Sequence, residues 1–324
     1  MQRSSSWTCK VHLYALLTIL VASAVTCGIT VPRQTIQELV SKALVESLAT
    51  KQRDLLDDLI DDYDDSQNYA DESLGRDPEE MPGFYEGDMA GVNDELARVG
   101  INFLKFPSRK WTNNTVPYII SPLYLPDEYM IIKTAVRILN FFTCINFRDW
   151  DGVEKDYLIF WPVEKPAGCW SYVGRLGGPQ IVSLQQPDLK SAQCFAGVGR
   201  PLHETMHALG VYHEQSRPDR DDHVKVEKKN VIRGFLSNFD KLDTKNVSAP
   251  YKYDYDSIMH YGTTFFSKNK KIATLVPKQK GKSIGQRINL SKLDCLKLNS
   301  LYGCLDESPF SKRKYETICE FLGL

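Results

Sequence analysis

Three histidines stand at the spacing of a metal site in the stretch Leu202-His203-Glu204-Thr205-Met206-His207-Ala208-Leu209-Gly210-Val211-Tyr212-His213-Glu214. On a helix, His203 and His207 lie one turn apart on the same face, so both imidazoles can reach one metal ion. Gly210 can take a positive φ and end the helix with a sharp turn, which brings His213 in from a third direction. Three protein ligands leave a fourth position open to water, and this opening distinguishes a catalytic zinc from a structural one.

Glu204 follows the first histidine and projects beside the two imidazoles, where a carboxylate can take a proton from water. The full pattern is H-E-x-x-H-x-x-G-x-x-H, and a candidate Met-turn, Ser257-Ile258-Met259-His260-Tyr261, stands downstream. A bare H-E-x-x-H also occurs on ordinary polar helices, but the extended pattern and the turn disfavour that alternative. The sequence therefore predicts a zinc site with an adjacent general base.

These motifs resemble those of the astacin family of zinc metalloendopeptidases, within the metzincin clan. The mark of astacins is a glutamate directly after the third histidine, here Glu214. The resemblance covers Trp111 to Cys304 and implies an α+β fold in which two subdomains flank a zinc cleft. The N-terminal half would hold a small twisted mixed sheet and the zinc helix. The C-terminal half would be irregular and end in a helix.

The resemblance also implies roles for the site residues. His203, His207 and His213 would bind one Zn2+ per chain, and Glu204 would be the catalytic base. Tyr261 would be a further zinc ligand at rest that swings away to donate a hydrogen bond to the tetrahedral oxyanion. The expected partners are protein or peptide substrates and an activating protease.

A short upstream element, Phe84-Tyr85-Glu86-Gly87-Asp88-Met89, resembles the zymogen motif of astacin propeptides. In that motif an aspartate occupies the open zinc position and displaces water, and phenylalanine is usual where this chain has Tyr85. Because Asp88 remains in register with Gly87, the resemblance implies that Asp88 is the zinc ligand of the zymogen. The alternative is an ordinary surface turn. After processing, Glu214 would become buried and meet the new terminal ammonium.

The N-terminus has the composition of a secretory signal peptide. Arg3 and Lys10 precede an apolar run from Val11 to Val25, which is short for a membrane span. An uncleaved signal anchor is the alternative, and no later segment is apolar enough to cross a bilayer. We therefore expect a secreted, extracellular protein. Candidate glycosylation sites at Asn113, Asn246 and Asn289 agree with export.

The chain divides into four predicted parts. Residues 1–24 form the signal peptide, whose end lies between 24 and 28, and residues 25–101 form a propeptide that ends between 98 and 101. The catalytic domain spans 102–304, and 305–324 form a short C-terminal tail. The formal net charge of −1 lacks the basic excess that is usual for nucleic-acid-binding proteins, so we expect no nucleic-acid partner.

Cysteine usage also agrees with export. Of the eight cysteines, Cys9 and Cys27 lie in or next to the signal peptide, and the residues alone leave the pairing of the others open. The astacin resemblance implies two disulfides and leaves a third, weaker pair: Cys144–Cys304, Cys169–Cys194, and the remaining Cys295 and Cys319.

Strands are predicted where β-branched and aromatic residues gather. The segment Gly168–Arg175 resembles the astacin edge strand above the cleft, to which an extended substrate pairs through backbone hydrogen bonds. A plain edge strand is the alternative. The other predicted strands are 116–120, 145–147, 157–161 and 181–184.

Helices are predicted over 126–142, from the spacing of apolar residues, and over Lys225–Phe239. A further helix near the C-terminus would have Ser291 as its N-cap and end near Gly303. Its core-facing residues would be Leu293, Leu296 and Leu301.

Two rival interpretations are weaker. A secreted binding protein could keep this scaffold without catalysis, but such a protein would be free to lose Glu204. Membership of another metzincin family is disfavoured by Glu214 and Tyr261.

Overall fold

The computed structural model describes residues 77–92, 103–187, 194–242 and 251–323. These residues belong to one compact unit, Asp64–Leu324. The predicted signal peptide, most of the predicted propeptide and its expected end lie outside the described residues. Within the described part of the chain, no helix combines the length and apolar character needed to cross a membrane.

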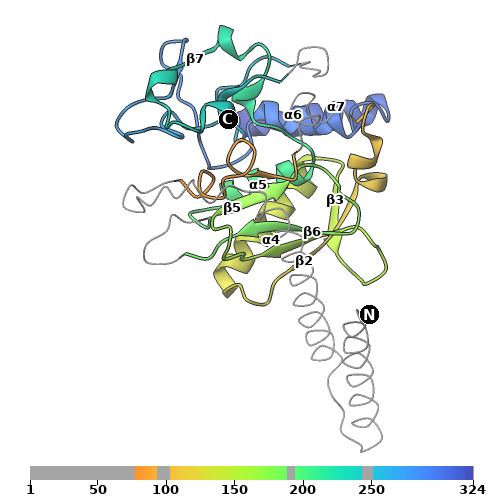
Figure 1. The fold of residues 1–324 in the computed structure, drawn as a ribbon. Helices are drawn as coiled ribbons and strands as arrows, with labels where there is room; N and C mark the ends of the chain where they lie inside the picture. Colours follow the sequence, from red (N-terminus) through yellow and green to blue (C-terminus); the bar gives the residue numbers. More distant parts are fainter. Residues whose placement is uncertain (1–76, 93–102, 188–193, 243–250, 324) are drawn as a thin grey trace, which may run out of the picture. The chain divides into compact units, whose positions relative to one another are not determined.

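A six-stranded mixed sheet lies below α5 in Figure 1. The strand order is β1-β5-β6-β4-β2-β3, in which β5 runs antiparallel to β6 and the other neighbours are parallel. Every residue of β4 is buried, as expected for a central strand of a largely parallel sheet. The five predicted strands are confirmed with ends shifted by at most three residues: β2 (Thr115–Ile120), β3 (Asn146–Asp149), β4 (Tyr157–Trp161), β5 (Cys169–Tyr172) and β6 (Pro179–Leu184). The short strand β1 (Met89–Ala90) was not predicted.

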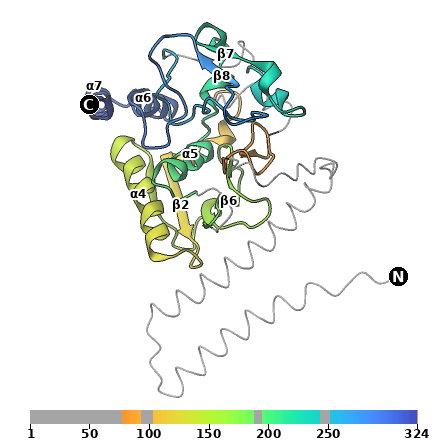
Figure 2. The same cartoon turned by 90° about the vertical axis from the view of Figure 1, so that its left-hand side faces the viewer.

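Two helices, α4 (Pro126–Phe142) and α5 (Gly199–Ala208), contact each other and the sheet (Figure 2). Helix α4 has the predicted bounds and begins where Glu128 accepts a hydrogen bond from the Leu125 amide at 2.8 Å. Fully buried Leu139 of α4 belongs to the same apolar core as Met206 of α5. This core fixes α5, which carries the first two histidines.

The C-terminal half is largely irregular, and the helix predicted over Lys225–Phe239 is wrong. That stretch contains β7 (Val224–Val226), which pairs antiparallel with β8 (Leu275–Pro277), and is then built from short 3-10 turns. Gly234 has a φ of 101°, which an α-helix does not allow. Most apolar residues of the stretch, among them Val231, Phe235 and Phe239, enter a second core cluster with Tyr261, whereas Leu236 is exposed.

The predicted C-terminal helix is present as α6 (Lys292–Leu301), and its capping is confirmed. Asp294 donates its amide to Ser291 Oγ at 2.8 Å, and Gly303 takes a φ of 76° after the helix. The predicted core face is only partly right: Leu301 is partly buried and packs against the main core, whereas Leu293 and Leu296 are partly buried and do not join it. Asp294 instead points inward and accepts hydrogen bonds from Ser257 Oγ and the Ile258 amide at 2.6 and 2.8 Å. The buried residues of α6 are Asp294, Cys295, Leu298 and Asn299.

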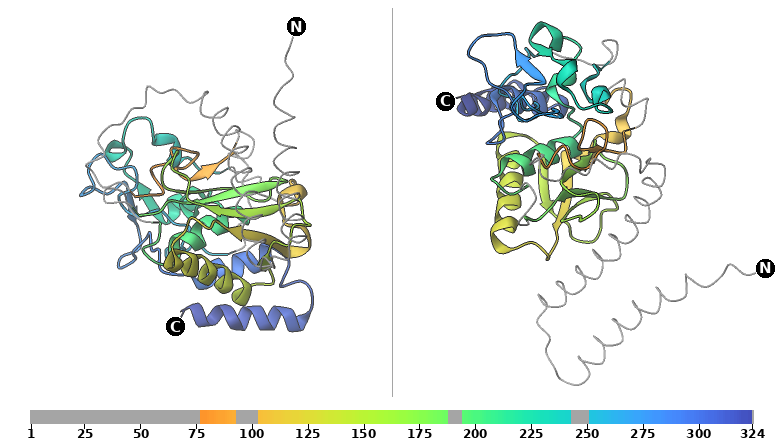
Figure 3. Two further views of the ribbon diagram at one scale, coloured as in Figure 1. Left: turned by 90° about the horizontal axis from the view of Figure 1, so that it is seen from below. Right: turned by 60° about the vertical axis from the view of Figure 1, so that its left-hand side comes forward.

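The predicted short tail contains a helix, α7 (Pro309–Glu320), that packs on α6 (Figure 3). Ser308 caps it by accepting from the Ser311 amide at 3.0 Å. Buried Tyr315 joins the main core, so this segment adds to the domain. All three expected disulfides are present: Cys144–Cys304, Cys169–Cys194 and Cys295–Cys319.

Candidate metal centre

The three histidines of the motif converge at one buried point. Helix α5 supplies His203 and His207, and Gly210 ends the following turn with a φ of 95°, so that His213 returns to them. The Nε2 atom of His203 lies 3.1 Å from that of His207 and 3.3 Å from that of His213. The predicted ligand set is therefore assembled in space.

In two of these histidines, the hydrogen bond made by Nδ1 determines whether Nε2 carries a proton or a lone pair. Nδ1 of His203 lies 2.8 Å from the Ile258 carbonyl, and Nδ1 of His207 lies 2.7 Å from the Val211 carbonyl. A carbonyl only accepts, so both Nδ1 atoms must carry the proton, and both Nε2 atoms of the neutral rings present lone pairs. Lone pairs that face each other at 3.1 Å are unfavourable without a cation between them. The donor set fits a zinc ion, with outer partners of the usual kind.

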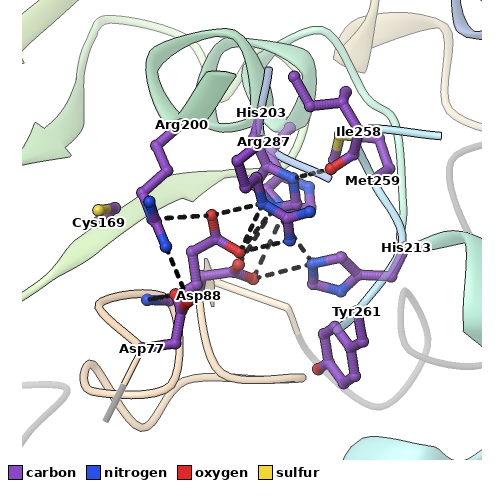
Figure 4. Close-up of polar contacts among 12 residues, drawn as sticks. Asp77, Asp88, Cys169, Arg200, His203, His213, Ile258, Met259, Tyr261 and Arg287 are labelled. Atoms are coloured by element: carbon purple, nitrogen blue, oxygen red, sulfur yellow. Dashed lines mark hydrogen bonds and ion pairs between the residues drawn. The ribbon is translucent and has the colours of Figure 1, made fainter. Parts of the chain in front are cut away.

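Asp88 completes the group from an upstream segment, which we define as residues 77–92. One of its carboxylate oxygens lies 3.2 Å from His203 Nε2, and the other lies 3.5 Å from His207 Nε2 and 3.3 Å from His213 Nε2 (Figure 4). These four residues form a buried cluster able to hold a metal ion. The astacin resemblance predicted that Asp88 lies at this site, although no pattern in the sequence around Asp88 indicates a contact with the histidines.

Glu204 lies on α5 beside the cluster and is fully buried. Among the described residues, neither of its carboxylate oxygens has a hydrogen-bond partner. Burial raises the pKa of Glu204 well above its usual value, and the negative charges of Asp88 and Glu79 raise it further. A carboxylate with a raised pKa is suited to accept a proton near neutral pH.

Tyr261, the last residue of the Met-turn, lies beside His213. Its ring centroid lies 4.7 Å from that of His213, and its hydroxyl donates to the Glu86 carbonyl of the upstream segment. Burial raises the pKa of Tyr261 well above its usual value. The hydroxyl is thus a neutral donor at the edge of the metal centre. Met259 is buried in the main core two residues earlier.

The predicted substrate strand β5 has the upstream segment on its outer edge. Met89 pairs in parallel with Ser171, and Ala90 pairs with Tyr172. The Ser171 amide donates to the Asp88 carbonyl at 3.0 Å, which ties this pairing directly to the metal centre. Backbone pairing of this kind covers an edge that an extended peptide would otherwise use.

Sequence reasoning missed the other acidic residues of the upstream segment that reach the site. Glu86 lies with Oε2 2.8 Å from His213 Nδ1, and Glu79 forms a close ion pair with Arg287. Burial, the largest single cause, would raise the pKa of Glu79, but Arg287, His203 and Arg200 together lower that pKa to about 2. Glu86 lies inside the Phe84–Met89 element that resembles the zymogen motif, so its position near the metal centre could have been predicted. Nothing in the sequence near Glu79 or Arg287 indicates that the two pair.

Glu214 is buried behind the third histidine and already has cationic partners. Its amide donates to the Met259 carbonyl at 3.0 Å. One carboxylate oxygen lies 3.2 Å from Arg217 Nη1, and the other accepts from Lys297 Nζ at 2.6 Å. Residues 93–102, which contain the expected end of the propeptide, lie outside the described residues, so the expected contact with a new terminus remains a prediction.

A comparison with known families matches residues 103–303 to the model for Astacin, a family of peptidases. The chain belongs to the astacin family. It is 35% identical over 300 residues to zinc metalloproteinase nas-4 of Caenorhabditis elegans, covering 89% of this chain and 92% of that protein. It is 36% identical to nas-12 of the same organism, over 65% of this chain but only 54% of that longer protein.

A solved structure with a similar fold is high choriolytic enzyme 1, a hatching enzyme zinc-protease from Oryzias latipes. It is 36% identical, with a TM-score of 0.52, and covers 60% of this chain and 93% of its own. The astacin-like α+β fold is thereby confirmed. This astacin is a zinc-dependent metalloendopeptidase that acts on protein or peptide substrates, and its histidine cluster suits that metal.

Proposed function

We propose that this astacin is a secreted endopeptidase made as a zymogen, in which His203, His207 and His213 hold the catalytic zinc and Asp88 blocks it. The observation that carries the proposal is the convergence of the three Nε2 atoms with the Asp88 carboxylate in one buried cluster. Zinc, when bound, supplies Lewis-acid chemistry for peptide hydrolysis.

Glu204 and Tyr261 are the proposed catalytic residues. Glu204 takes a proton from the attacking water and passes it to the leaving amine, a role that its buried position next to His203 supports. Tyr261 donates a hydrogen bond to the oxyanion that develops on the substrate carbonyl. Its hydroxyl now donates to the Glu86 carbonyl, so this donor becomes available when the upstream segment leaves.

The upstream segment belongs, on this proposal, to a propeptide that covers residues 25–101 after a signal peptide of residues 1–24. Three features support latency: Asp88 at the histidines, β1 on the substrate strand, and the engaged hydroxyl of Tyr261. An activating protease cuts after one of residues 98–101 and frees the catalytic domain, residues 102–304. The product acts outside the cell.

Secretion and processing of the full chain test this proposal. We expect zinc in the purified protein, little cleavage of casein before limited proteolysis, and strong cleavage afterwards, with a new terminus identified by N-terminal sequencing. Asp88→Ala should cleave casein before processing, whereas the control Asp306→Ala, at an exposed position, should stay latent. Equal latency of wild type and Asp88→Ala would contradict the blocking role.

A further inference from the structure

A pocket opens beside strands β7 and β8 in the C-terminal half of the molecule. Its volume is about 430 Å³, within the range of pockets that hold small ligands. It is lined by residues within 220–228, by residues 239–241 and by Lys278. Figure 2 shows β7 and β8 on the opposite side of α5 from β2 and β6, so this pocket lies apart from the six-stranded sheet.

Positive charge predominates in this pocket, which we call the basic pocket. Its cationic side chains are Arg220, Lys225, Lys228, Lys241 and Lys278. Against these five stand two anionic side chains, those of Asp221 and Asp240. The whole chain has a formal net charge of −1, so the positive excess is a feature of the pocket and not of the chain. A concave site lined by charge of one sign concentrates ions of the opposite sign.

Hydrogen bonds to backbone carbonyls fix the shape of the basic pocket. Arg220 is buried, and it donates from Nη1 to the Gln215 carbonyl at 3.0 Å and from Nη2 to the Phe239 carbonyl at 2.7 Å. The Lys278 amide donates to the His223 carbonyl at 2.8 Å. The three lining stretches are thereby held together by the catalytic region itself, so the pocket is formed before any ligand binds.

Three ammonium groups of the basic pocket are available to a ligand. Lys228 is exposed, and within the described part of the chain its ammonium has no hydrogen bond or ion pair. Lys225 Nζ pairs with Glu227 at 2.5 Å, but the lysine side chain stays 63% exposed. Lys241 Nζ pairs with Asp221 at 2.7 Å, where both side chains are exposed. Exposed ion pairs contribute little to stability, so an anionic ligand can replace these carboxylates.

The donors of the basic pocket suit sulfate groups. An ammonium is a compact point charge that meets a tetrahedral anion from any side, whereas a flat carboxylate is held best by a guanidinium fork. The guanidinium of Arg220 already donates from both terminal nitrogens to backbone carbonyls. Phe239 is only 2% exposed, so the described lining offers no open ring face on which a nucleic-acid base could stack. Several ammonium groups around one pocket therefore favour a chain of sulfated sugars.

We propose that the basic pocket binds a sulfated polysaccharide through the ammonium groups of Lys225, Lys228 and Lys241. The metal cluster and the upstream segment contribute no residue to the described lining, so the intact and the processed chain present the same site. The inference goes beyond peptide hydrolysis and does not depend on it. Combined with the proposed secretion, such binding would retain the protein on polysaccharide-bearing surfaces outside the cell.

Fluorescence anisotropy on the intact full chain tests the site, in about 0.15 M NaCl so that long-range attraction is screened. The probes are a labelled heparin octasaccharide and an unsulfated heparosan octasaccharide, which keeps the carboxylates. We expect the sulfated probe to bind about tenfold or more tightly than the unsulfated one. The double variant Lys225→Gln/Lys228→Gln should bind the sulfated probe about tenfold more weakly than wild type, because each lysine near a dense anionic ligand contributes to binding.

A variant that should gain affinity separates binding from structural damage. Asp221→Asn removes the carboxylate that now pairs with Lys241, so the sulfated probe should bind about threefold or more tightly. Damage to the pocket would weaken binding in this variant as well. The control is Lys312→Gln, which removes the same charge from α7, away from the pocket lining, and should bind like wild type.

Three results would overturn the proposal. The first is equal binding of the sulfated and unsulfated probes, and the second is an affinity that the double lysine variant does not change. The third is a single-stranded DNA of the same charge that binds as tightly as the sulfated probe or more tightly, which would indicate a general polyanion site. Binding requires no turnover, so these results are independent of whether the processed chain cleaves peptides.

Discussion

Two of the three histidines differ from the third in what holds them. His203 and His207 bond through Nδ1 to the carbonyls of Ile258 and Val211, which belong to the catalytic region. His213 bonds through Nδ1 to the carboxylate of Glu86, 127 positions upstream. Removal of the upstream segment would leave two rings with their partners and take the partner from the third. The metal centre thus has a permanent half, made of catalytic-region residues and their partners there, and a removable half, made of the contacts that the upstream segment supplies.

The largest expected effect lies in the permanent half. Glu204→Gln keeps the shape of the side chain but removes the proposed base, so kcat of the processed chain should fall about 10²–10⁴-fold. Zinc content, measured by elemental analysis, should stay the same, because no histidine changes. Glu307→Gln, at an exposed position, is the matched control. Near-normal turnover by Glu204→Gln would remove this residue from the mechanism.

A somewhat smaller effect is expected from Tyr261, whose hydroxyl contacts the removable half. Tyr261→Phe should lower kcat of the processed chain about 10²–10³-fold, as for the loss of one oxyanion donor. The zinc content should change little. Tyr255→Phe is a matched control in the same region, because its hydroxyl donates to the His223 carbonyl instead. If metal loss were the main result, Tyr261 would be a ligand rather than a donor.

Glu86 tests the removable half directly. Glu86→Gln replaces a charged partner of His213 with a neutral amide of the same shape, which should weaken the hold of the upstream segment. The rate at which the intact chain cleaves casein before processing should therefore rise about tenfold. After processing, when the segment has left, the variant and the wild type should have the same kcat/KM. A difference that persisted after processing would mean that the segment stays bound.

The same division explains what the sequence predicted. Helix spacing and turn chemistry are local, so they predicted the positions of His203, His207 and Gly210 from one short stretch of sequence. Asp88 could be placed only through a resemblance, because nothing near it in the chain indicates the histidines. The contact between Glu79 and Arg287 joins residues 208 positions apart, and no periodic pattern records such a pairing.

The errors in the fold have local causes as well. Val231, Phe235 and Phe239 recur every four residues, as on a helix, but they enter the second core through turns around Gly234. Helix α7 was missed because few of its residues are buried; Tyr315 and Cys319 hold it to the core and to α6. In both places tertiary contacts override the apolar spacing on which the predictions rested.

The smallest effect on turnover is expected from Glu214 and Lys297. Their contact also tests whether the partner of Glu214 changes when the upstream segment is removed. Lys297 Nζ donates to Glu214 Oε2 at 2.6 Å in the intact chain, where a terminal ammonium is expected after processing. Lys297→Met should therefore lower the free energy of unfolding of the intact chain by about 1–3 kcal/mol, since a charge-assisted hydrogen bond to a buried carboxylate is lost. A double-mutant cycle with Glu214→Gln, followed by thermal unfolding, should show that the two losses do not add. If the new terminus replaces Lys297, this coupling should shrink after processing; a coupling of the same size before and after would mean that Lys297 remains the partner of Glu214 and that the terminal ammonium binds elsewhere.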